Sequence, residues 1–264
     1  MKTIRCAAAA AACLFLFTGC MFHDDTLSPQ NARTKTCTAQ EAIPSGAVSL
    51  NTDISVGDVT VSYGDGQDVS VQASVKANHG KTASGAEELL GLTEVALTQD
   101  GKILRVAVRS SKTRTDMWQW IKQNRPDTDY SADLDITVPQ SMDSFVLYTK
   151  VGDIRLNAPH GVVTAQADVG DVDAENPTFS GESLLKADVG NVTCAFTGAQ
   201  PGTGNLSIYA GTGDIHLQAA DGLVQSSTTH KQVTGGAETT VFHSGLTVSS
   251  DTKVGSITGA VVVS

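Results

Sequence analysis

One short pattern recurs along most of this chain: a valine or threonine, a glycine, a small polar residue, and then a run that begins with valine or isoleucine. The copies are Gly57–Asp58, Gly152–Asp153, Gly170–Asp171, Gly190–Asn191, Gly213–Asp214 and Gly255–Ser256, with a weaker copy at Gly235–Gly236. From Gly152 onward, successive glycines are separated by 18, 20, 23, 22 and 20 residues. A period near twenty predicts units that stack on one another, because one short unit cannot bury its own apolar face.

Each unit has the same parts. Residues 145–149 alternate apolar and polar side chains before Gly152, and residues 154–156 alternate after it. Alternation with a period of two buries one face of a strand, and glycine permits the bend between two strands. We therefore expect an all-β fold, a single-domain β-solenoid with coils of about twenty residues. Its expected core includes Val172, Val192, Cys194, Ile215, Leu217 and Ile257.

The repeated aspartates have two interpretations. Asp58, Asp153, Asp171 and Asp214 can accept hydrogen bonds from nearby backbone N–H groups, which is how aspartate stabilises turns. They could also form a ladder of calcium ligands, but calcium needs about six to eight convergent oxygen atoms. We favour turn capping and expect no metal or cofactor.

A stacked β-fold could also carry an enzyme that cleaves polysaccharides. Asp168, Asp171, Asp173 and Asp188 are close in the chain, and such sites use paired carboxylates or a carboxylate with a basic partner. Lys186 is the only basic residue near them. The chain has no nucleophile elbow, phosphate-binding loop or dinucleotide fingerprint. We expect no enzymatic activity and keep a polysaccharide lyase or hydrolase as the alternative.

Residues 1–19 have the features of a lipoprotein signal peptide. Two basic residues precede the unbroken apolar run Cys6–Phe17, which as a helix of about 1.5 Å per residue is too short to cross a bilayer core of about 30 Å. The run leads to Cys20 in the sequence F-T-G-C, which resembles the lipobox of bacterial lipoproteins. We expect a lipid on Cys20 that holds the protein to a membrane outside the cytoplasm. Met21 in place of Asp favours the outer membrane of a Gram-negative cell.

The remaining chain is acidic. Removing 19 of 264 residues leaves 245, with 18 − 2 = 16 basic and 28 acidic residues, a net charge of −12. This charge disfavours binding to nucleic acid. Residues 20–46 are polar and predict a flexible tether behind the lipid. Cys37 and Cys194 could pair outside the cytoplasm, but we expect two free thiols.

Residues 84–132 interrupt the repeats. The sequence Ser84–Glu87 resembles a capping box and predicts a short helix, and residues 93–99 and 102–109 predict a hairpin around Asp100–Gly101. Residues 110–132 are expected to form an irregular insertion. Its aromatic and basic side chains are the candidate binding residues: Trp118, Trp120, Tyr130, Arg114, Lys122 and Arg125. The alternative is that the tryptophans fold onto the array as a lid.

The order of these segments resembles a known bacterial family. A strand, a helix with Glu87–Leu90, a hairpin, the strand Leu134–Pro139 and then repeated Gly-Asp-[Ile/Val] units are similar to the "putative adhesin" domain, a domain of unknown function. The resemblance covers residues 47–264 and implies a β-solenoid that is exported or exposed on the cell surface. The insertion at 110–132 departs from the family pattern.

These observations together predict a lipid-anchored, non-enzymatic module for adhesion, scaffolding or interaction in the cell envelope. Its expected partners are the membrane, through Cys20, and an envelope protein or glycan. A component that senses a ligand or envelope stress is a further alternative.

Overall fold

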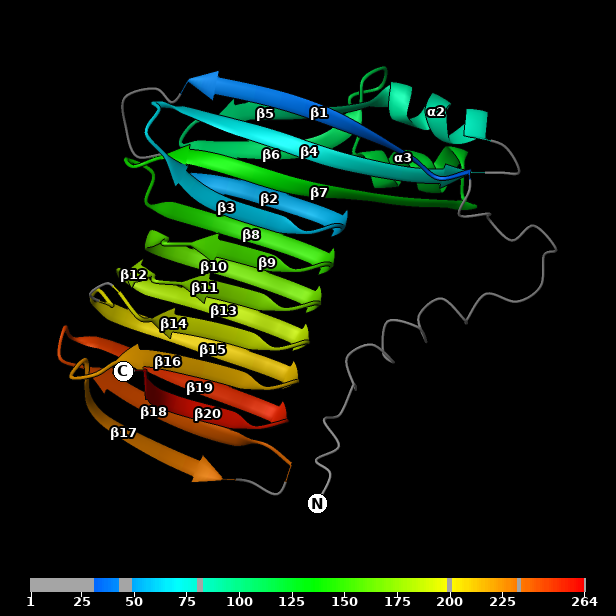
Figure 1. Ribbon diagram of the computed structural model, residues 1–264. Coiled ribbons are helices and arrows are strands. Elements are labelled where there is room, and N and C mark those ends of the chain that lie inside the picture. The colour runs from blue at the N-terminus through cyan, green and yellow to red at the C-terminus, as the bar shows by residue number, and fades with distance from the viewer. Residues whose placement is uncertain (1–30, 43–48, 80–82, 199–200, 232–233, 264) are drawn as a thin grey trace.

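The computed structural model describes residues 31–42, 49–79, 83–198, 201–231 and 234–263, so the signal sequence and Cys20 lie outside the described residues. The chain forms two β-sheets, with two short helices at one end of the molecule (Figure 1). Sheet A has nine strands in the order β1-β4-β7-β3-β9-β11-β14-β16-β20. Sheet B has eleven, in the order β17-β18-β19-β15-β13-β10-β8-β2-β6-β5, with β12 paired to β10. The all-β expectation is confirmed.

Six units make the middle of the molecule, and each crosses from sheet B to sheet A at one of the glycines. Each strand pairs in parallel with its equivalent in the neighbouring unit, so the chain advances by one strand in each sheet per unit. The sheet B strands are β2 (Ser49–Val56), β8 (Ser144–Val151), β10 (His160–Val169), β13 (Glu182–Val189), β15 (Gly204–Thr212) and β19 (Leu246–Val254). The sheet A strands are β3 (Val59–Gly64), β9 (Ile154–Asn157), β11 (Val172–Glu175), β14 (Val192–Phe196), β16 (Ile215–Ala220) and β20 (Ile257–Val263).

The glycines at the corners cannot be replaced without strain. Gly170 and Gly190 have φ angles of +142° and +149°, which side chains with a Cβ rarely adopt. A Cβ on Gly170 would lie 1.9 Å from the carbonyl oxygen of Gly152, and one on Gly190 would lie 2.0 Å from that of Gly170. Each corner glycine therefore lies against the backbone of the corner before it, and the space for a side chain is already filled.

The polar residue after each glycine links one corner to the next. The carboxylate of Asp153 accepts a hydrogen bond from the Asp171 N–H at 2.9 Å, and Asp171 accepts one from Asn191 N–H at 2.7 Å. The amide oxygen of Asn191 continues the series to Asp214 N–H at 2.9 Å. Asp58 and Asp214 make the same contact with Asp153 and Ser256. This series, the corner ladder, satisfies backbone N–H groups that the sheets do not pair.

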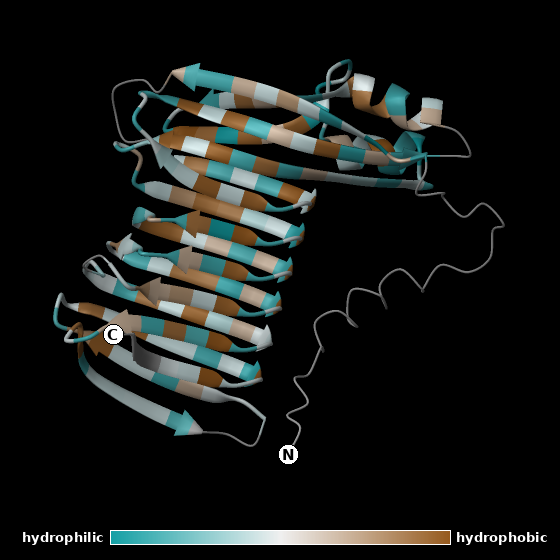
Figure 2. Ribbon diagram, viewed as in Figure 1, coloured by the Kyte–Doolittle hydropathy of each residue, from teal (hydrophilic) through white to brown (hydrophobic). Residues whose placement is uncertain are grey.

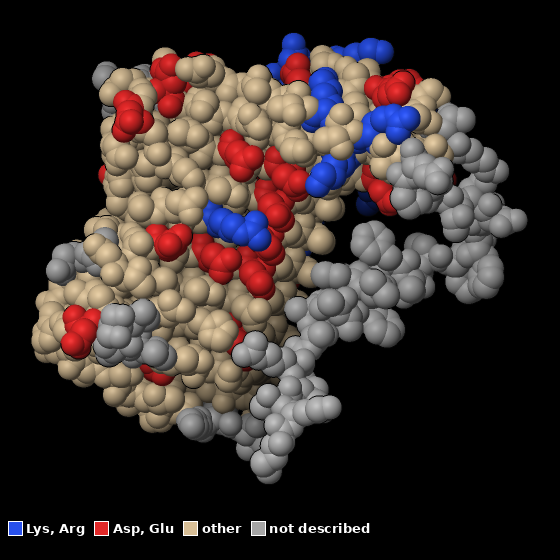
Figure 3. Space-filling model, viewed as in Figure 1, with Lys and Arg blue, Asp and Glu red and all other residues tan. Residues whose placement is uncertain are grey.

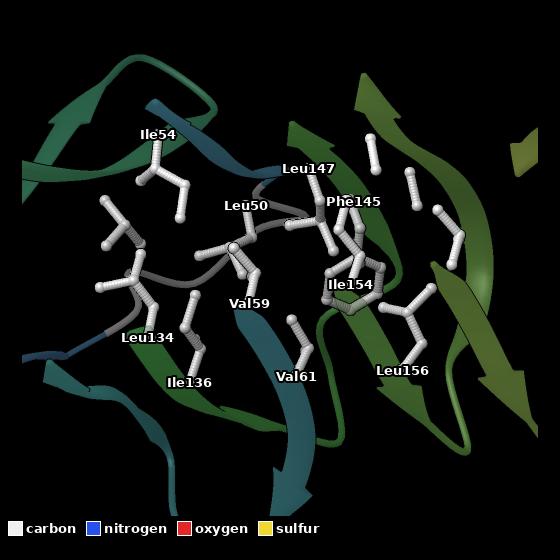
Figure 4. Packing of buried hydrophobic residues seen from close by; sticks show 14 of the residues in the cluster. Leu50, Ile54, Val59, Val61, Leu134, Ile136, Phe145, Leu147, Ile154 and Leu156 are labelled. Atoms are coloured by element: carbon white, nitrogen blue, oxygen red, sulfur yellow. The ribbon is translucent and has the colours of Figure 1, made fainter. Parts of the chain in front are cut away.

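The core lies between the two sheets. Hydropathy alternates along the strands in Figure 2, and the apolar side chains of both sheets point toward each other in Figure 4. Leu50 and Phe145 from sheet B meet Val59 and Ile154 from sheet A there, all nearly fully buried. Burying one such side chain contributes about 1.5–3 kcal/mol. The predicted positions Val172, Val192, Cys194, Ile215 and Leu217 are buried, and Ile257 is partly buried.

Additional strands cover both ends of the stacked units. At one end, β7 (Thr128–Pro139), β4 (Asp68–His79) and β1 (Arg33–Ala42) extend sheet A, while β6 (Ile103–Ser110) and β5 (Thr93–Asp100) extend sheet B. At the other end, β18 (Gly236–Phe242) and β17 (Val224–Lys231) continue sheet B in antiparallel fashion. The remaining strand, β12 (Thr178–Phe179), is short.

Three expectations need correction here. The expected tether over 20–46 includes β1, which pairs with β4 along its whole length, so only part of that segment can act as a tether. The weaker copy at Gly235–Gly236 is not a corner, because Gly236 lies opposite both Lys231 and Thr252 within sheet B. The expected irregular insertion at 110–132 contains helix α3 (Met117–Asn124) and the first residues of β7.

The predicted helix and hairpin are present. Helix α2 runs from Ala83 to Leu92, so Ser84 lies inside its first turn and not ahead of it. Strands β5 and β6 pair antiparallel around Gly101, which has a φ of +58°. Neither described helix is long and apolar enough to cross a membrane.

Candidate functional site

Helix α3 carries both tryptophans. It begins after Asp116, whose carboxylate accepts a hydrogen bond from the Gln119 N–H at 2.8 Å. Because residues are about 100° apart around a helix, Trp118 and Trp120 do not share a face. The Trp118 ring packs edge-on against Tyr130 with centroids 5.5 Å apart, and Tyr130 is buried. Tyr130 is therefore a core residue, while both tryptophans pack partly against the core.

The three basic candidates around α3 differ in their contacts. Arg114 forms an ion pair with Glu94, and a guanidinium nitrogen of Arg125 lies 3.4 Å from the Glu88 carboxylate. Lys122 is exposed. Two of the three positive charges are thus already paired, which lowers what they could contribute to binding an acidic partner.

A cavity of about 640 Å³ lies beside α3, at the ends of β4 and β7. Two residues of its lining carry a buried polar atom that has no hydrogen-bond partner within the described chain: Oδ1 of Asn78 and Nε1 of Trp118. Leaving such an atom unpaired costs about 1–3 kcal/mol, so each one needs an explanation.

A row of polar and aromatic side chains crosses the outer face of sheet B. The backbone register aligns Asp53 with Tyr148, Tyr148 with Gln166, Gln166 with Lys186, Lys186 with Tyr209, and Tyr209 with Asp251. These side chains point outward, because their neighbours along each strand are buried in the core. We call these six residues the sheet B row.

Neighbouring groups hold the two tyrosines of this row in place. The Tyr148 hydroxyl donates a hydrogen bond to the Asp168 carboxylate at 2.6 Å, and this bond raises the pKa of Tyr148 to about 12. The ammonium groups of Lys186 and Lys253 lie 5.9 and 5.4 Å from the centre of the Tyr209 ring. Both rings are half-buried.

The sequence contains a signal for this row that motif searching missed. Every member lies four residues before a corner glycine, from Asp53 before Gly57 to Asp251 before Gly255. Aligning the repeats on their glycines and comparing that single column would have found the row. No comparable signal marks Asn78, because its place at the cavity depends on pairing with a distant strand, opposite Asp129.

The four aspartates considered for catalysis lie in different parts of the units, before, at and after the corner. Asp168 and Asp188 precede corner glycines, and Asp188 lies 3.0 Å from the Lys186 ammonium group. Asp171 belongs to the corner ladder, and Asp173 lies on sheet A, where burial raises its pKa. Among the described residues, no three His, Cys, Asp or Glu side chains are grouped to hold a metal ion. The acidic side chains on the face shown in Figure 3 gather over its middle strands.

Comparisons with known proteins give a limited result. No family model matches the sequence, and no curated protein matches it. Among solved structures, it is similar to a "putative cell adhesion protein" from Clostridium sporogenes ATCC 15579, at 12% identity and a TM-score of 0.37, over 84% of this chain and 98% of that one. It is also similar to a "putative adhesin" from Bacteroides fragilis NCTC 9343, at 14% identity and a TM-score of 0.36, over 84% and 96%.

Proposed function

We propose that this chain is a non-enzymatic interaction module of the bacterial cell envelope, which binds a glycan or protein through the sheet B row. In this proposal the corner units form a β-solenoid, because each unit pairs in parallel with the next at a constant register. Lipid on Cys20 holds the module to a membrane outside the cytoplasm, as the F-T-G-C sequence indicates.

The sheet B row carries this proposal. Six strands spaced about 4.8 Å apart give it a length of about 24 Å, which suits an extended partner such as a polysaccharide chain. Tyrosine supplies a large, rigid contact area with a polar end. Its side chain has only two rotatable torsions, so little conformational entropy is lost when it binds. The hydrogen bond from Tyr148 to Asp168 and the lysines around Tyr209 restrict both side chains in the free protein. This lowers the conformational entropy that is lost on binding.

The row is a better candidate than the α3 surface for this contact. Around α3, Tyr130 is buried and two of the three basic groups are paired. The candidate residues Trp118, Trp120 and Lys122 remain partly or fully exposed there. They belong to a second surface, and the row does not depend on them.

The alternative of a polysaccharide-cleaving enzyme has less support. A hollow of about 390 Å³ adjoins the row and is lined by Asp53, Arg105 and Tyr148, and the nearby Asp168 carboxylate is engaged in the hydrogen bond from Tyr148. Glycosidases use two carboxyl groups about 5–9.5 Å apart across the scissile bond. Binding without cleavage fits this lining better.

Binding by the row can be tested with the double substitution Tyr148→Ala and Tyr209→Ala. Binding of residues 21–264 to purified envelope polysaccharide and to whole cells should fall at least tenfold, with the melting temperature nearly unchanged because both rings lie outside the core. The matched control is Gln72→Ala with Thr137→Ala, which changes a hollow on the outer face of sheet A. Equal loss in both double variants, or loss in the control alone, would contradict the proposal. Shortening of the polysaccharide during the assay would favour the enzyme.

The anchor is tested in the same cells. Cys20→Ala should abolish incorporation of labelled palmitate into the protein, because no other residue is proposed to carry lipid. Continued incorporation would refute the anchor and leave the sheet B binding test unaffected.

A further inference from the structure

Strand β17 (Val224–Lys231) is the outermost strand of sheet B, at the end of the molecule opposite the helices (Figure 1). It pairs with β18 on one side, and within the described residues no strand or isolated bridge pairs with its other edge. The backbone N–H and C=O groups along that edge are therefore free to bind another strand. Neither the fold nor the proposed function gives this edge a role.

The other edge strands are covered by neighbouring parts of the chain. At the helical end, Lys35 of β1 donates hydrogen bonds to the carbonyl oxygens of Leu90 and Thr93, at 2.8 and 3.1 Å, which hold β1 against α2 and β5. At the opposite end, β20 packs against β18, because a Cβ on Gly259 would lie 2.4 Å from the Glu238 carboxylate. Proteins usually cover or charge such edges, because an open one recruits other strands.

Strand β17 has neither form of protection. Residues 225–230 are exposed, and residues 224–230 include no lysine, arginine, aspartate or glutamate. The strand also has no proline, which would remove a hydrogen-bond donor. An open, uncharged edge of this kind is the surface to which an extended segment of another chain adds as a further strand.

The hairpin of β17 and β18 is nearly neutral in an otherwise acidic protein. Glu238 is its only acidic residue; it is buried and accepts hydrogen bonds from the hydroxyl groups of Ser227, Thr229 and Thr240. Lys231 is its only lysine or arginine. A second copy of the chain therefore meets less repulsion at this end than at the middle strands, where carboxylates gather in Figure 3.

The sequence of β17, Val-Gln-Ser-Ser-Thr-Thr-His-Lys, is compatible with pairing to itself. Two copies can lie antiparallel about a two-fold axis, the commonest symmetry of protein dimers. An axis at Ser227 or at Thr228 keeps the inner faces of both sheets on the same side, because opposite residues then share a face. In either register, serine and threonine side chains lie opposite one another and no two like charges do.

We propose that two copies of this chain pair end to end through their β17 edges and so join two membranes. Ala32 precedes β1, the outermost strand of sheet A at the helical end, so the lipid on Cys20 is attached at the end opposite β17. Nine steps of about 4.8 Å separate β5 from β17, so each copy holds its free edge about 43 Å beyond β5. The joining of membranes rests on the proposed anchor, whereas the pairing of edges does not.

Vesicles can reproduce this arrangement without lipid on Cys20. Residues 21–264, which contain every described residue, carry an N-terminal histidine tag and bind to phosphatidylcholine vesicles that contain a nickel-chelating lipid. Many weak contacts act together between two such surfaces, so the vesicles should cluster and light scattering should rise. The same chain tagged at the C-terminus, which follows β20, turns β17 toward its own membrane and should not cluster vesicles.

Charges on β17 test whether the two edges pair with each other. Ser226 and Thr228 lie on the outer face of the strand, because the alternate residues Ser227 and Thr229 reach the buried Glu238. Ser226→Lys with Thr228→Lys, and Ser226→Glu with Thr228→Glu, put like charges opposite each other in either register, so each double variant should cluster at least tenfold more slowly. A mixture of vesicles carrying one variant with vesicles carrying the other should cluster again.

The matched control is Thr34→Lys with Thr36→Lys, two exposed positions of β1, the edge strand at the anchored end. This variant should cluster vesicles like the parent, and so should Tyr148→Ala with Tyr209→Ala, because the sheet B row is not part of the contact. Failure of the edge pairing therefore leaves the polysaccharide and palmitate tests unaffected.

Three results would overturn the proposal. Parent vesicles that stay dispersed would show that the edges do not pair, and charged variants that cluster as fast as the parent would place the contact elsewhere. Loss in both charged variants without recovery in their mixture would mean that β17 binds a strand other than its own copy.

Discussion

Gly170 illustrates how a single atom can decide the geometry of this fold. Its φ of +142° and the Gly152 carbonyl oxygen, 1.9 Å from where a Cβ would be, exclude any side chain by two separate effects. The carbonyl is part of the neighbouring corner and cannot move alone, because the Gly152 N–H and the strands around it are hydrogen-bonded. The repeated glycine is therefore a packing requirement between units as well as a bend within one.

We expect Gly170→Ala to destabilise the protein by at least about 2 kcal/mol, because positive φ alone costs a residue with a Cβ about 1–2 kcal/mol and the clash adds to it. Urea unfolding followed by circular dichroism measures the loss. Gly91→Ala in α2 is the matched control, since a Cβ there would meet no atom within 4 Å beyond the adjoining residues and backbone of its own helix. Alanine favours helix, so the control should be neutral or more stable by up to about 1 kcal/mol. A Gly170→Ala variant as stable as the parent would mean that the corner can relax.

At the scale of elements, the corner ladder links successive units through the one backbone N–H at each corner that lies between the two sheets. Asn191 occupies one position of the ladder and accepts its hydrogen bond at 2.9 Å without a negative charge. A neutral amide oxygen thus accepts the same kind of hydrogen bond as the aspartates on either side. Arg155 lies between Asp58 and Asp153, at 3.3 and 2.6 Å, and offsets their mutual repulsion.

The ladder predicts different outcomes for two substitutions of Asp171. Asp171→Asn keeps the acceptor for the Asn191 N–H and should change stability by less than about 0.5 kcal/mol. Asp171→Ala removes it and should cost about 1 kcal/mol, since water can reach this half-buried corner and replace part of the bond. Thermal melts with and without calcium measure both. A calcium-dependent rise in melting temperature that Asp171→Asn abolishes would support the cation ladder instead.

At the scale of the whole molecule, the stacked middle was predictable and the two ends were not. The middle repeats one pattern, so alternation around Gly152 or Gly190 indicates both its strands and their partners. Strand β1 escaped prediction because it is an edge strand with a single largely buried side chain, Cys37, and its other residues resemble a polar tether. Strand β17 is rich in serine and threonine and pairs only with β18, so it has no buried face to produce a pattern.

The sequence contains a helix-start signal for α3 within a polar segment. Asp116 and Gln119 have the spacing of a helix N-terminus, but the polar segment around them predicts an irregular insertion. The sheet B row could be read from one column of the repeat alignment. The cavity could not, because it depends on how far β4 and β7 extend past the stacked units.

The two cysteines test whether the end strands and the stacked middle are far apart and open independently. Both are free and buried. Cys37 is in β1 at the edge of sheet A, six strands from Cys194 in β14, a distance of about 29 Å at about 4.8 Å per strand. A disulfide requires Cα atoms within about 7 Å, so both thiols should be found free after unfolding without reductant.

Their rates of labelling should differ in the folded protein. Burial raises the pKa of both thiols, which slows the reaction of each until its surroundings open. Strand β1 pairs on one side only, so it can open without disrupting the middle, whereas exposing Cys194 requires the stacked units to separate. In residues 21–264, mass spectrometry after timed alkylation in mild urea should show Cys37 modified at least tenfold faster. Equal rates would mean that the molecule opens as one unit, and faster labelling of Cys194 would contradict its place in the core.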